Sequence, residues 1–352
     1  MSTTNPRVEK SKPAIAVYGA SGHTGRFVVN ELAARGFVPI AVARDETKLA
    51  AGGALAEGTV KRVASIEDQA SLGHALAGAA AVINCAGPFL DTADAVITAA
   101  LRAKIHYLDV TAEQESARRT YEKFAVPARE AGVVVLPGMG FYGGLGDLLA
   151  TAAMGDWTRA DAIDLAIALD SWSPTLGTRV TGRRNTFRRV IVSGGALEPL
   201  PDPAPTRSWS FAAPFGVQEM VALPFAEVIL IARHLRASDI RNYLNTSSLR
   251  GLRDPATPPP VAADASGRSA QIFRMEATVR RDGRVRRAAV SGRDIYAFSA
   301  PLVVEAAERV LGDGAARRGV FAPGELFDPR DFLRALGAEL DAGEPIGAGE
   351  GG

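Results

Sequence analysis

Up to about residue 150, short apolar runs alternate with longer stretches in which apolar residues recur every three or four positions. The short runs indicate buried strands, and the longer stretches indicate amphipathic helices. Strands that alternate with helices form a parallel sheet covered on both faces, so the pattern predicts a doubly wound α/β domain. The predicted strands lie near residues 14–18, 38–43, 60–63, 80–85, 105–110 and 132–136.

Beyond about residue 160 the pattern changes and predicts a second, mixed unit. Ala162–Leu169 alternates like a strand, and Met275–Val279 and Val285–Val290 flank Asp282-Gly283, a dipeptide typical of a tight hairpin. Pro301–Leu311 has helical spacing and is expected to return to the first unit. The patterns predict a Rossmann-type domain over residues 13–150, a mixed α/β (α+β) domain over 151–300, a helical return over 301–335 and a disordered tail over 341–352.

A glycine-rich turn follows the first predicted strand. Its glycines are three residues apart and lead into a helix-like stretch. Such a turn lets a pyrophosphate reach the backbone at the start of the helix, where free N–H groups and the helix dipole favour negative charge. A glycine triplet alone also fits an ordinary loop, so the prediction depends on its place between strand and helix. The residues expected to hold the cofactor are Gly19, Ser21, Gly22, His23, Thr24 and Gly25.

The end of the second predicted strand indicates which cofactor binds. Arg44 is the first polar residue there, about where dinucleotide-binding folds contact the adenosine ribose, and Lys48 follows one helical turn later. A guanidinium pairs well with a 2′-phosphate, so the sequence favours NADP(H) over NAD(H). Asp45 leaves an alternative open, because its carboxylate suits either a ribose hydroxyl or the cap of the next helix.

The composition of the chain mainly excludes certain partners and kinds of site. The 352 residues are 47% hydrophobic and carry a net charge of +1, which gives no reason to expect nucleic acid or a membrane surface as a partner. The most apolar long stretch, Val221–Ala232, is too short to span a bilayer, and residues 1–12 lack the apolar core of a signal peptide. The single cysteine and the four histidines offer neither a disulfide nor metal-ligand spacing. We expect a cytoplasmic protein without a metal.

Three more strand ends should line the nicotinamide half of the site, because ligands bind outside the carboxyl ends of parallel strands. The fifth predicted strand ends at Asp109, and the sixth leads into a glycine-rich loop that contains Tyr142. The fourth runs into residues expected to border the cofactor, namely Cys85, Ala86, Gly87 and Pro88.

Several segments give the chain a resemblance to the saccharopine dehydrogenase-like reductases. They are Gly19–Gly25, Val82–Phe89, His106–Thr111, Pro137–Phe141 with Leu145–Asp147, and Gly319–Pro323. The Gly-Pro-Phe and Tyr-Leu-Asp-Val-Thr-Ala-Glu stretches look more like the trans-acting enoyl reductase branch than like true saccharopine reductases. The resemblance extends from about residue 14 to 335. It implies a Rossmann domain that binds NADP(H), a mixed domain for substrate and dimerisation, and therefore a homodimer.

Tyr142 and Asp109 are the candidate catalytic residues. The branches compared usually carry an aspartate where this chain has Tyr142, which argues against an amino-acid substrate and places a phenol near the expected substrate. Tyr142 either donates a proton or packs as an ordinary aromatic residue. Asp109 and Glu113 flank Thr111, where a carboxylate could orient substrate or relay a proton; the alternative is that Thr111 caps the following helix with Glu113 as its partner glutamate.

The remaining candidates favour structural interpretations. His106 lies inside a predicted strand and is typical of a core histidine, and Cys85 at a buried strand end is more typical of a structural thiol than of a nucleophile. A basic run could hold a carboxylate or a phosphopantetheine-type tail, although an exposed, solvated face is favoured. It comprises Arg179, Arg183, Arg184, Arg188 and Arg189.

Two functions are compatible with the sequence. The first is an NADP(H)-dependent oxidoreductase that transfers hydride to a C=N, C=O or activated C=C bond of a small metabolite or acyl substrate, with few essential protein acids. The second is a non-catalytic NADP-sensing protein. An enclosed pocket over the nicotinamide, lined by Tyr142 and Asp109, would favour the enzyme. A short-chain dehydrogenase is disfavoured, because none of the six tyrosines has a lysine four residues on.

Overall fold

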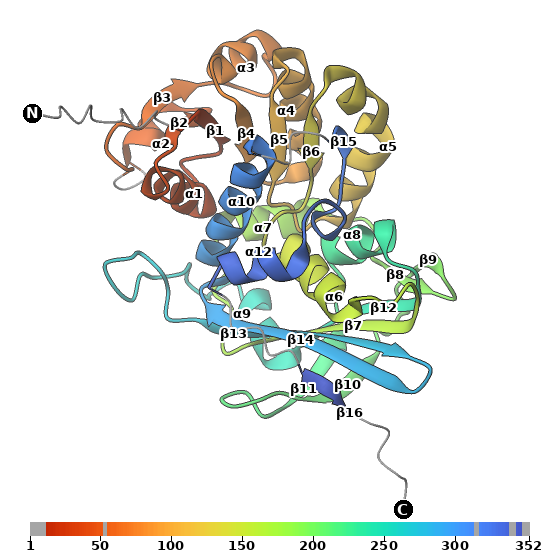
Figure 1. Cartoon of the computed structure of the whole chain (residues 1–352). Coiled ribbons are helices and arrows are strands. Elements are labelled where there is room, and N and C mark those ends of the chain that lie inside the picture. Colours follow the sequence, from red (N-terminus) through yellow and green to blue (C-terminus); the bar gives the residue numbers. More distant parts are fainter. Residues whose placement is uncertain (1–11, 52–54, 313–316, 338–342, 347–352) are drawn as a thin grey trace, which may run out of the picture.

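Two sheets organise the chain in a computed structural model that describes residues 12–51, 55–312, 317–337 and 343–346 (Figure 1). A seven-stranded sheet with helices on both faces forms the upper part in the figure, and a larger mixed sheet forms the lower part. The predicted fold class, a doubly wound α/β unit with a second mixed unit, is confirmed.

The first sheet has the order β15-β6-β5-β4-β1-β2-β3, with all neighbours parallel. All six predicted strands are present, with small differences at their ends. β1 lies between β2 and β4, and the order in which strands are added to the sheet reverses at β1. The carboxyl ends of β1 and β4 therefore border the crevice where dinucleotides bind in such folds. The strands are β1 (Ala14–Tyr18), β2 (Val38–Ala43), β3 (Val60–Val63), β4 (Ala81–Asn84), β5 (His106–Asp109), β6 (Val134–Leu136) and β15 (Gly319–Val320).

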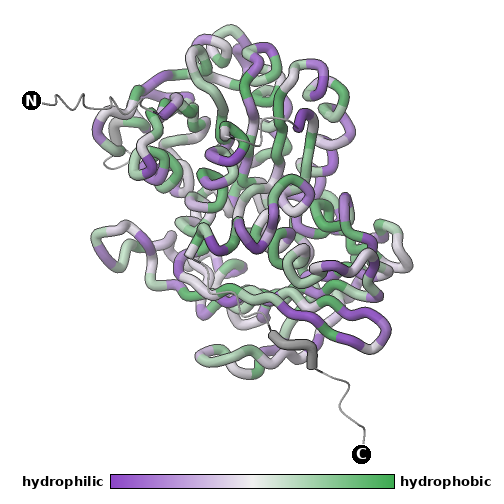
Figure 2. The backbone as a smooth tube through the Cα atoms, in the orientation of Figure 1, coloured by the Kyte–Doolittle hydropathy of each residue, from purple (hydrophilic) through white to green (hydrophobic). Residues whose placement is uncertain are grey.

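The helices of this unit follow from local signals. α3 begins after Asp68, whose carboxylate accepts hydrogen bonds from the N–H groups of Ala70 and Ser71, and α5 ends at Gly132 in the left-handed conformation. β1, β2 and β6 consist of apolar residues and are almost wholly buried, whereas β3 at the edge of the sheet is largely exposed (Figure 2). The helices are α1 (His23–Ala34), α2 (Glu46–Ala51), α3 (Gln69–Leu76), α4 (Phe89–Ala103) and α5 (Gln114–Ala131).

The second sheet has the order β10-β11-β12-β7-β13-β14-β16, with β8 beside β12 and β9 beside β8. The predicted hairpin is confirmed, since β13 and β14 pair antiparallel across Asp282 and Gly283, both with positive φ (49° and 74°). The strands are β7 (Ala160–Leu169), β8 (Val190–Ser193), β9 (Ala196–Pro199), β10 (Thr206–Ser210), β11 (Val217–Ala222), β12 (Ala237–Asn245), β13 (Ile272–Arg281), β14 (Arg284–Arg293) and β16 (Gly343–Ile346).

The tail differs in part from the expected disorder. Gly343–Ile346 form β16, which adds to the free edge of β14 through backbone pairing that composition does not reveal. The other residues predicted to be disordered, 341–342 and 347–352, lie outside the described residues.

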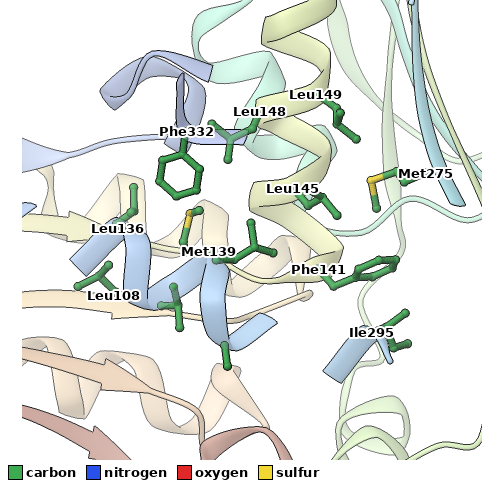
Figure 3. Close-up of a cluster of buried hydrophobic side chains, with 14 of the residues drawn as sticks. Leu108, Leu136, Met139, Phe141, Leu145, Leu148, Leu149, Met275, Ile295 and Phe332 are labelled. Atoms are coloured by element: carbon green, nitrogen blue, oxygen red, sulfur yellow. The ribbon is translucent and has the colours of Figure 1, made fainter. Parts of the chain in front are cut away.

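One apolar core joins the two sheets through the helices between them. It runs from Leu108 and Leu136 of the first sheet, past Leu148 of α6 and Phe332 of α12, to Met275 of the second sheet (Figure 3). The remaining helices are α6 (Gly146–Met154), α7 (Leu176–Arg184), α8 (Ala226–His234), α9 (Thr246–Arg253), α10 (Ile295–Leu311), α11 (Pro323–Leu326) and α12 (Pro329–Ala335). The shared core holds the loops between the sheets in a fixed relation.

α10 contains the predicted helical return and packs against α1. Among the helices described, none combines the length and the apolar character that a membrane crossing requires.

A buried ion pair ties α6 to α8 and α11. Asp147 is fully buried, its Oδ1 lies 2.7 Å from Nε2 of His234, and its Oδ2 accepts a hydrogen bond from the N–H of Gly324 at 2.6 Å. Burial lowers the pKa of His234, but the charge and the hydrogen bond of Asp147 outweigh burial, so that the pKa lies above its ordinary value.

We expect the stability that this pair contributes to be lost in alkaline solution. A histidine pKa raised by folding adds stability below the unfolded pKa of about 6.5, and this stability is lost as the pH rises through the folded value. The melting temperature of the wild type should therefore fall between pH 6 and pH 9 by more than that of His234→Gln. Equal pH profiles in thermal unfolding would show that the pair does not contribute in this way.

Candidate functional site

The turn between β1 and α1 is built by two glycines that the fold itself requires. Gly19 has a φ of +84°, and a Cβ there would lie 2.8 Å from the backbone nitrogen of Ala86. A Cβ on Gly25 would lie 2.2 Å from the carbonyl oxygen of Gly19. Gly19 therefore lets the β1 loop approach the β4 loop, and Gly25 lets α1 pack on the turn.

Gly22 differs from the other two because an added Cβ there would meet a tight contact rather than a clash. It is exposed, and the nearest atom to an added Cβ is the Gly19 oxygen at 3.2 Å. Gly22 is also the N-cap of α1, and no side chain caps the helix. The first-turn N–H groups, which include those of His23 and Thr24, therefore have no side-chain acceptor, a geometry suited to an anion.

The His23 side chain points away from this anion position, toward α10. Its ring contacts Phe27 and Tyr296 edge-to-face at centroid distances of 5.4 and 5.5 Å. Its Nε2 is buried without a partner among the described residues, and burial lowers its pKa. Any contact of His23 with phosphate therefore involves its backbone N–H.

At the end of β2, the helix cap accounts for Asp45. Its Oδ1 accepts hydrogen bonds from the N–H and the hydroxyl of Thr47 at 2.9 and 2.6 Å, at the start of α2. Arg44 is exposed, and within the described part of the chain no group accepts a hydrogen bond from its guanidinium. Lys48 is also exposed, on α2. Two cations thus stand where a 2′-phosphate is expected, and the carboxylate of Asp45 is already engaged.

The β4 loop is braced by Asn84 and covered by α7. The side chain of Asn84 donates to Thr92 at 3.1 Å and accepts from the N–H of Ala86 at 3.0 Å. A Cβ on Gly87 would lie 2.8 Å from the hydroxyl of Thr181 on α7, so α7 lies directly against this loop. Burial raises the pKa of the partly buried Cys85 thiol, which fits a structural thiol rather than a nucleophile.

Asp109 is a fully buried junction between loops. One carboxylate oxygen accepts from the N–H groups of Thr111 and Gly138 at 2.9 and 2.7 Å, and the other from the hydroxyl of Tyr107 at 2.8 Å. Burial raises its pKa to about 6, although the three hydrogen bonds oppose that rise. This arrangement fixes the loops after β5 and β6, and a catalytic role for Asp109 stays a prediction.

Glu113 caps a different helix from the one expected. It precedes α5, but its carboxylate accepts hydrogen bonds from the N–H groups of Phe89 and Leu90, at 2.7 and 3.3 Å, at the start of α4. The Thr111 hydroxyl accepts from the N–H of Glu113 at 3.0 Å, but Glu113 is not the partner glutamate of a cap on α5, so that part of the alternative is wrong. Within the described residues, the carboxylates of Asp109 and Glu113 accept no hydrogen bond from an N–H group of α5. The start of α4 lies beside the β5 loop, and the free N–H groups of α4 bind Glu113 instead.

Tyr142 lies in an aromatic stack at the sharp turn Phe141–Leu145. Its ring centroid is 5.3 Å from that of Trp172 and 4.3 Å from that of Phe225. Its hydroxyl is buried and has no hydrogen-bond partner among the described residues, and burial raises its pKa well above the ordinary value. The turn is linked to Asp109 through Gly138, whose N–H is bound by Asp109 and whose carbonyl accepts from Gly144 at 2.7 Å.

Glu227, which the sequence analysis did not single out, lies close to this stack. It is fully buried near the start of α8, and its Oε1 accepts from the N–H of Phe225 at 2.9 Å. Its Oε2 has no partner among the described residues, and burial raises its pKa to about 7. In the sequence, the one indication of this residue was a single acidic residue inside the apolar stretch Val221–Ala232. Buried acids with shifted pKa values are common at functional sites.

A hydrogen-bond network joins the start of α7 to α10. The hydroxyl of Tyr296 accepts from Trp172 Nε1 at 3.0 Å and from the Thr175 N–H at 3.3 Å, and lies 3.0 Å from the Thr178 hydroxyl. α7 itself has no buried residue.

The basic run does not form one patch. Arg179 binds backbone carbonyls at Asp254 and Thr257, Arg184 pairs with Asp91, and Arg189 is half-buried and binds the carbonyl of Pro224. The prediction of one solvated face is therefore wrong for Arg189. β8 begins at the next residue and draws Arg189 inward.

Comparisons with known proteins find a similar cofactor-binding domain. Residues 15–136 match the family model of the saccharopine dehydrogenase NADP binding domain, a domain type that binds NADP. A saccharopine dehydrogenase-like oxidoreductase of Bos taurus is 30% identical over 145 residues, covering 36% of this chain and 34% of the relative. A lipid droplet localized protein of Caenorhabditis elegans is 29% identical over 143 residues, covering 37% and 34%. This chain thus matches about a third of the length of either relative.

The fold extends further than these sequence matches. Apo saccharopine dehydrogenase (L-Glu forming) from Saccharomyces cerevisiae superposes with a TM-score of 0.65, covering 96% of this chain and 100% of its own, at 15% identity. The similarity shows that both sheets of this chain have counterparts in a known fold.

Proposed function

We propose that the chain is an NADP(H)-dependent oxidoreductase that transfers hydride to a C=N, C=O or activated C=C bond of a small metabolite or acyl substrate. The observation that carries the proposal is the uncapped glycine turn at the start of α1, beside the exposed Arg44, in a segment that matches an NADP-binding domain. Bound NADPH supplies the hydride. The resemblance to the trans-acting enoyl reductase branch supports an acyl substrate.

The roles of this chain's residues follow from their positions. The turn around Gly22 binds the pyrophosphate, Arg44 and Lys48 bind the 2′-phosphate, and the loops after β4, β5 and β6 border the nicotinamide. Tyr142 donates the proton that accompanies hydride transfer, with Glu227 as the nearby buried acid. We assign Asp109 the task of positioning the two loops that lead to Tyr142. A cytoplasmic homodimer with domain boundaries near residues 150 and 300 completes the proposal.

One observation favours the second candidate, a non-catalytic NADP sensor. The polar atoms of Tyr142 and Asp109 are buried, and α7 lies against Gly87, so this conformation is closed where substrate would enter. The two functions separate when the protein is mixed with NADPH and panels of carbonyl, imine and 2-enoyl thioester acceptors. An enzyme consumes NADPH and passes deuterium from labelled NADPH to an acceptor. A sensor binds NADPH and consumes none, and failure to bind NADPH contradicts both.

Replacing Arg44 with alanine should separate NADPH from NADH. Loss of a charge-assisted hydrogen bond to the 2′-phosphate weakens NADPH binding by roughly 1.5–3 kcal/mol, while NADH has no group to lose. Fluorescence titration with both cofactors measures the difference. An equal loss for NADPH and NADH would remove Arg44 from 2′-phosphate recognition.

A further inference from the structure

A pocket outside the cofactor crevice lies between α5, α8 and the segment that follows α7. Its volume is about 170 Å³. Three guanidinium groups, those of Arg118, Arg188 and Arg189, line it together with one carboxylate, that of Glu115. The pocket is therefore rich in positive charge, although the chain as a whole is almost neutral.

Arg189 is the most buried of the three cations and lacks a fully charged partner. Its guanidinium donates to the carbonyl oxygen of Pro224 and lies 4.8 Å from the centroid of the Phe225 ring. The acid that acts on it is Glu227, whose own pKa burial raises to about 7. A half-buried cation without an ion-pair partner is costly to desolvate unless an anion approaches it.

The other two cations differ in their availability. Arg118 is neutralised by Glu115 and Glu122. Arg188 is exposed, and its only recorded acceptor within the described residues is the carbonyl oxygen of Leu200 at 3.4 Å. Arg188 and Arg189 therefore have donor capacity left for a ligand.

The backbone beside Arg189 is held in place before any ligand arrives. The Gln114 side chain accepts from the N–H of Val190 and donates to its carbonyl, both at 2.9 Å. A guanidinium on a fixed backbone loses less conformational freedom when it binds. Apolar side chains of Phe187, Leu197 and Ile229 form the rest of the lining that a ligand would contact.

We propose that this pocket binds a small ligand through an oxyanion group, a carboxylate or a phosphate, held by Arg189 and Arg188, with a short apolar portion against Phe187, Leu197 and Ile229. The site is separate from the glycine turn and does not depend on the proposed reaction. Planar guanidinium groups bind either oxyanion through paired hydrogen bonds.

Isothermal titration of the full chain with excess NADP⁺ tests the site, because the cofactor occupies the glycine turn. The probes are hexanoate, inorganic phosphate and hexanamide, which matches hexanoate without its charge. We expect at least one oxyanion to bind and hexanamide not to bind. Arg189→Gln should weaken that binding about tenfold or more, as expected for a lost charged hydrogen bond. Arg183→Gln, on the exposed face of α7 and outside the pocket, should leave it unchanged.

Binding of hexanoate alone assigns a carboxylate, and binding of phosphate alone assigns a phosphate. If neither oxyanion binds, or if hexanamide binds as well as hexanoate, the proposal is wrong. It is also wrong if Arg183→Gln and Arg189→Gln weaken binding equally. Should Arg189→Gln fail to fold, Arg188→Gln, an exposed position in the same pocket, decides instead, and unchanged binding in that variant overturns the proposal.

Discussion

Replacing Gly22 with valine is expected to abolish NADPH binding without unfolding the chain. An added Cβ would lie 3.2 Å from the Gly19 oxygen, a tight contact that a shift of a few tenths of an ångström relieves, and Gly22 has a negative φ, so we expect the fold to accept a side chain at this exposed position. The same side chain is incompatible with a pyrophosphate on the first turn of α1, because it displaces the pyrophosphate from the free N–H groups. Loss of even two charge-assisted hydrogen bonds, at roughly 1.5–3 kcal/mol each, weakens binding by at least about 100-fold.

Two other glycines separate this effect from general damage. Gly73→Val, in α3, places a side chain in open space far along the chain from the turn, and NADPH affinity should stay at the wild-type value. Gly25→Val forces a side chain against the Gly19 carbonyl and should destabilise the fold itself. Fluorescence titration and thermal unfolding of the three variants give the comparison. Unchanged NADPH affinity in Gly22→Val would mean that the glycine loop is only a turn.

The features predicted correctly from sequence depend on neighbours along the chain. The strands of the first sheet are short apolar runs, and the β13–β14 hairpin is encoded in Asp282-Gly283 between two alternating segments. The glycine turn and Arg44 follow from spacing relative to these strands. Each such signal lies within a single supersecondary unit, which explains why the dinucleotide-binding half could be anticipated.

The features that could not be predicted depend on tertiary contacts. Glu113 caps α4 rather than α5, because α4 starts next to the β5 loop in space. Glu227 becomes a buried acid only where α8 packs against the loop that carries Tyr142, and its sequence context resembles any apolar helix with one acid. α7 covers Gly87 through a contact between residues 87 and 181 that no local pattern encodes. The strands and turns that carry the candidate cofactor residues could therefore be predicted, whereas the tertiary contacts around Tyr142 could not.

Tyr142→Phe is expected to lower turnover while raising stability. The hydroxyl of Tyr142 is buried without a partner among the described residues, and such a group costs about 1–3 kcal/mol in the folded state. Removing it leaves the ring in place between Trp172 and Phe225, so the free energy of unfolding should rise by about 1 kcal/mol. If the phenol donates the proton to the reduced substrate, kcat should fall by about 10²–10⁴ with little change in NADPH affinity.

Tyr121→Phe is the matched control for this pair of effects. Its hydroxyl is also buried without a partner in the described structure, but it lies on α5, with the guanidinium of Arg233 5.2 Å from its ring centroid, and it is not one of the rings stacked on Tyr142. This variant should gain stability and keep full turnover on any acceptor that the acceptor panels identify. If the tyrosine only packs, removing its unpaired hydroxyl raises the stability of the protein and leaves its activity unchanged. If the tyrosine is the proton donor, the protein gains stability and loses activity. If Tyr142→Phe behaves like Tyr121→Phe, the proton comes from water or from the substrate, and Tyr142 is an aromatic packing residue.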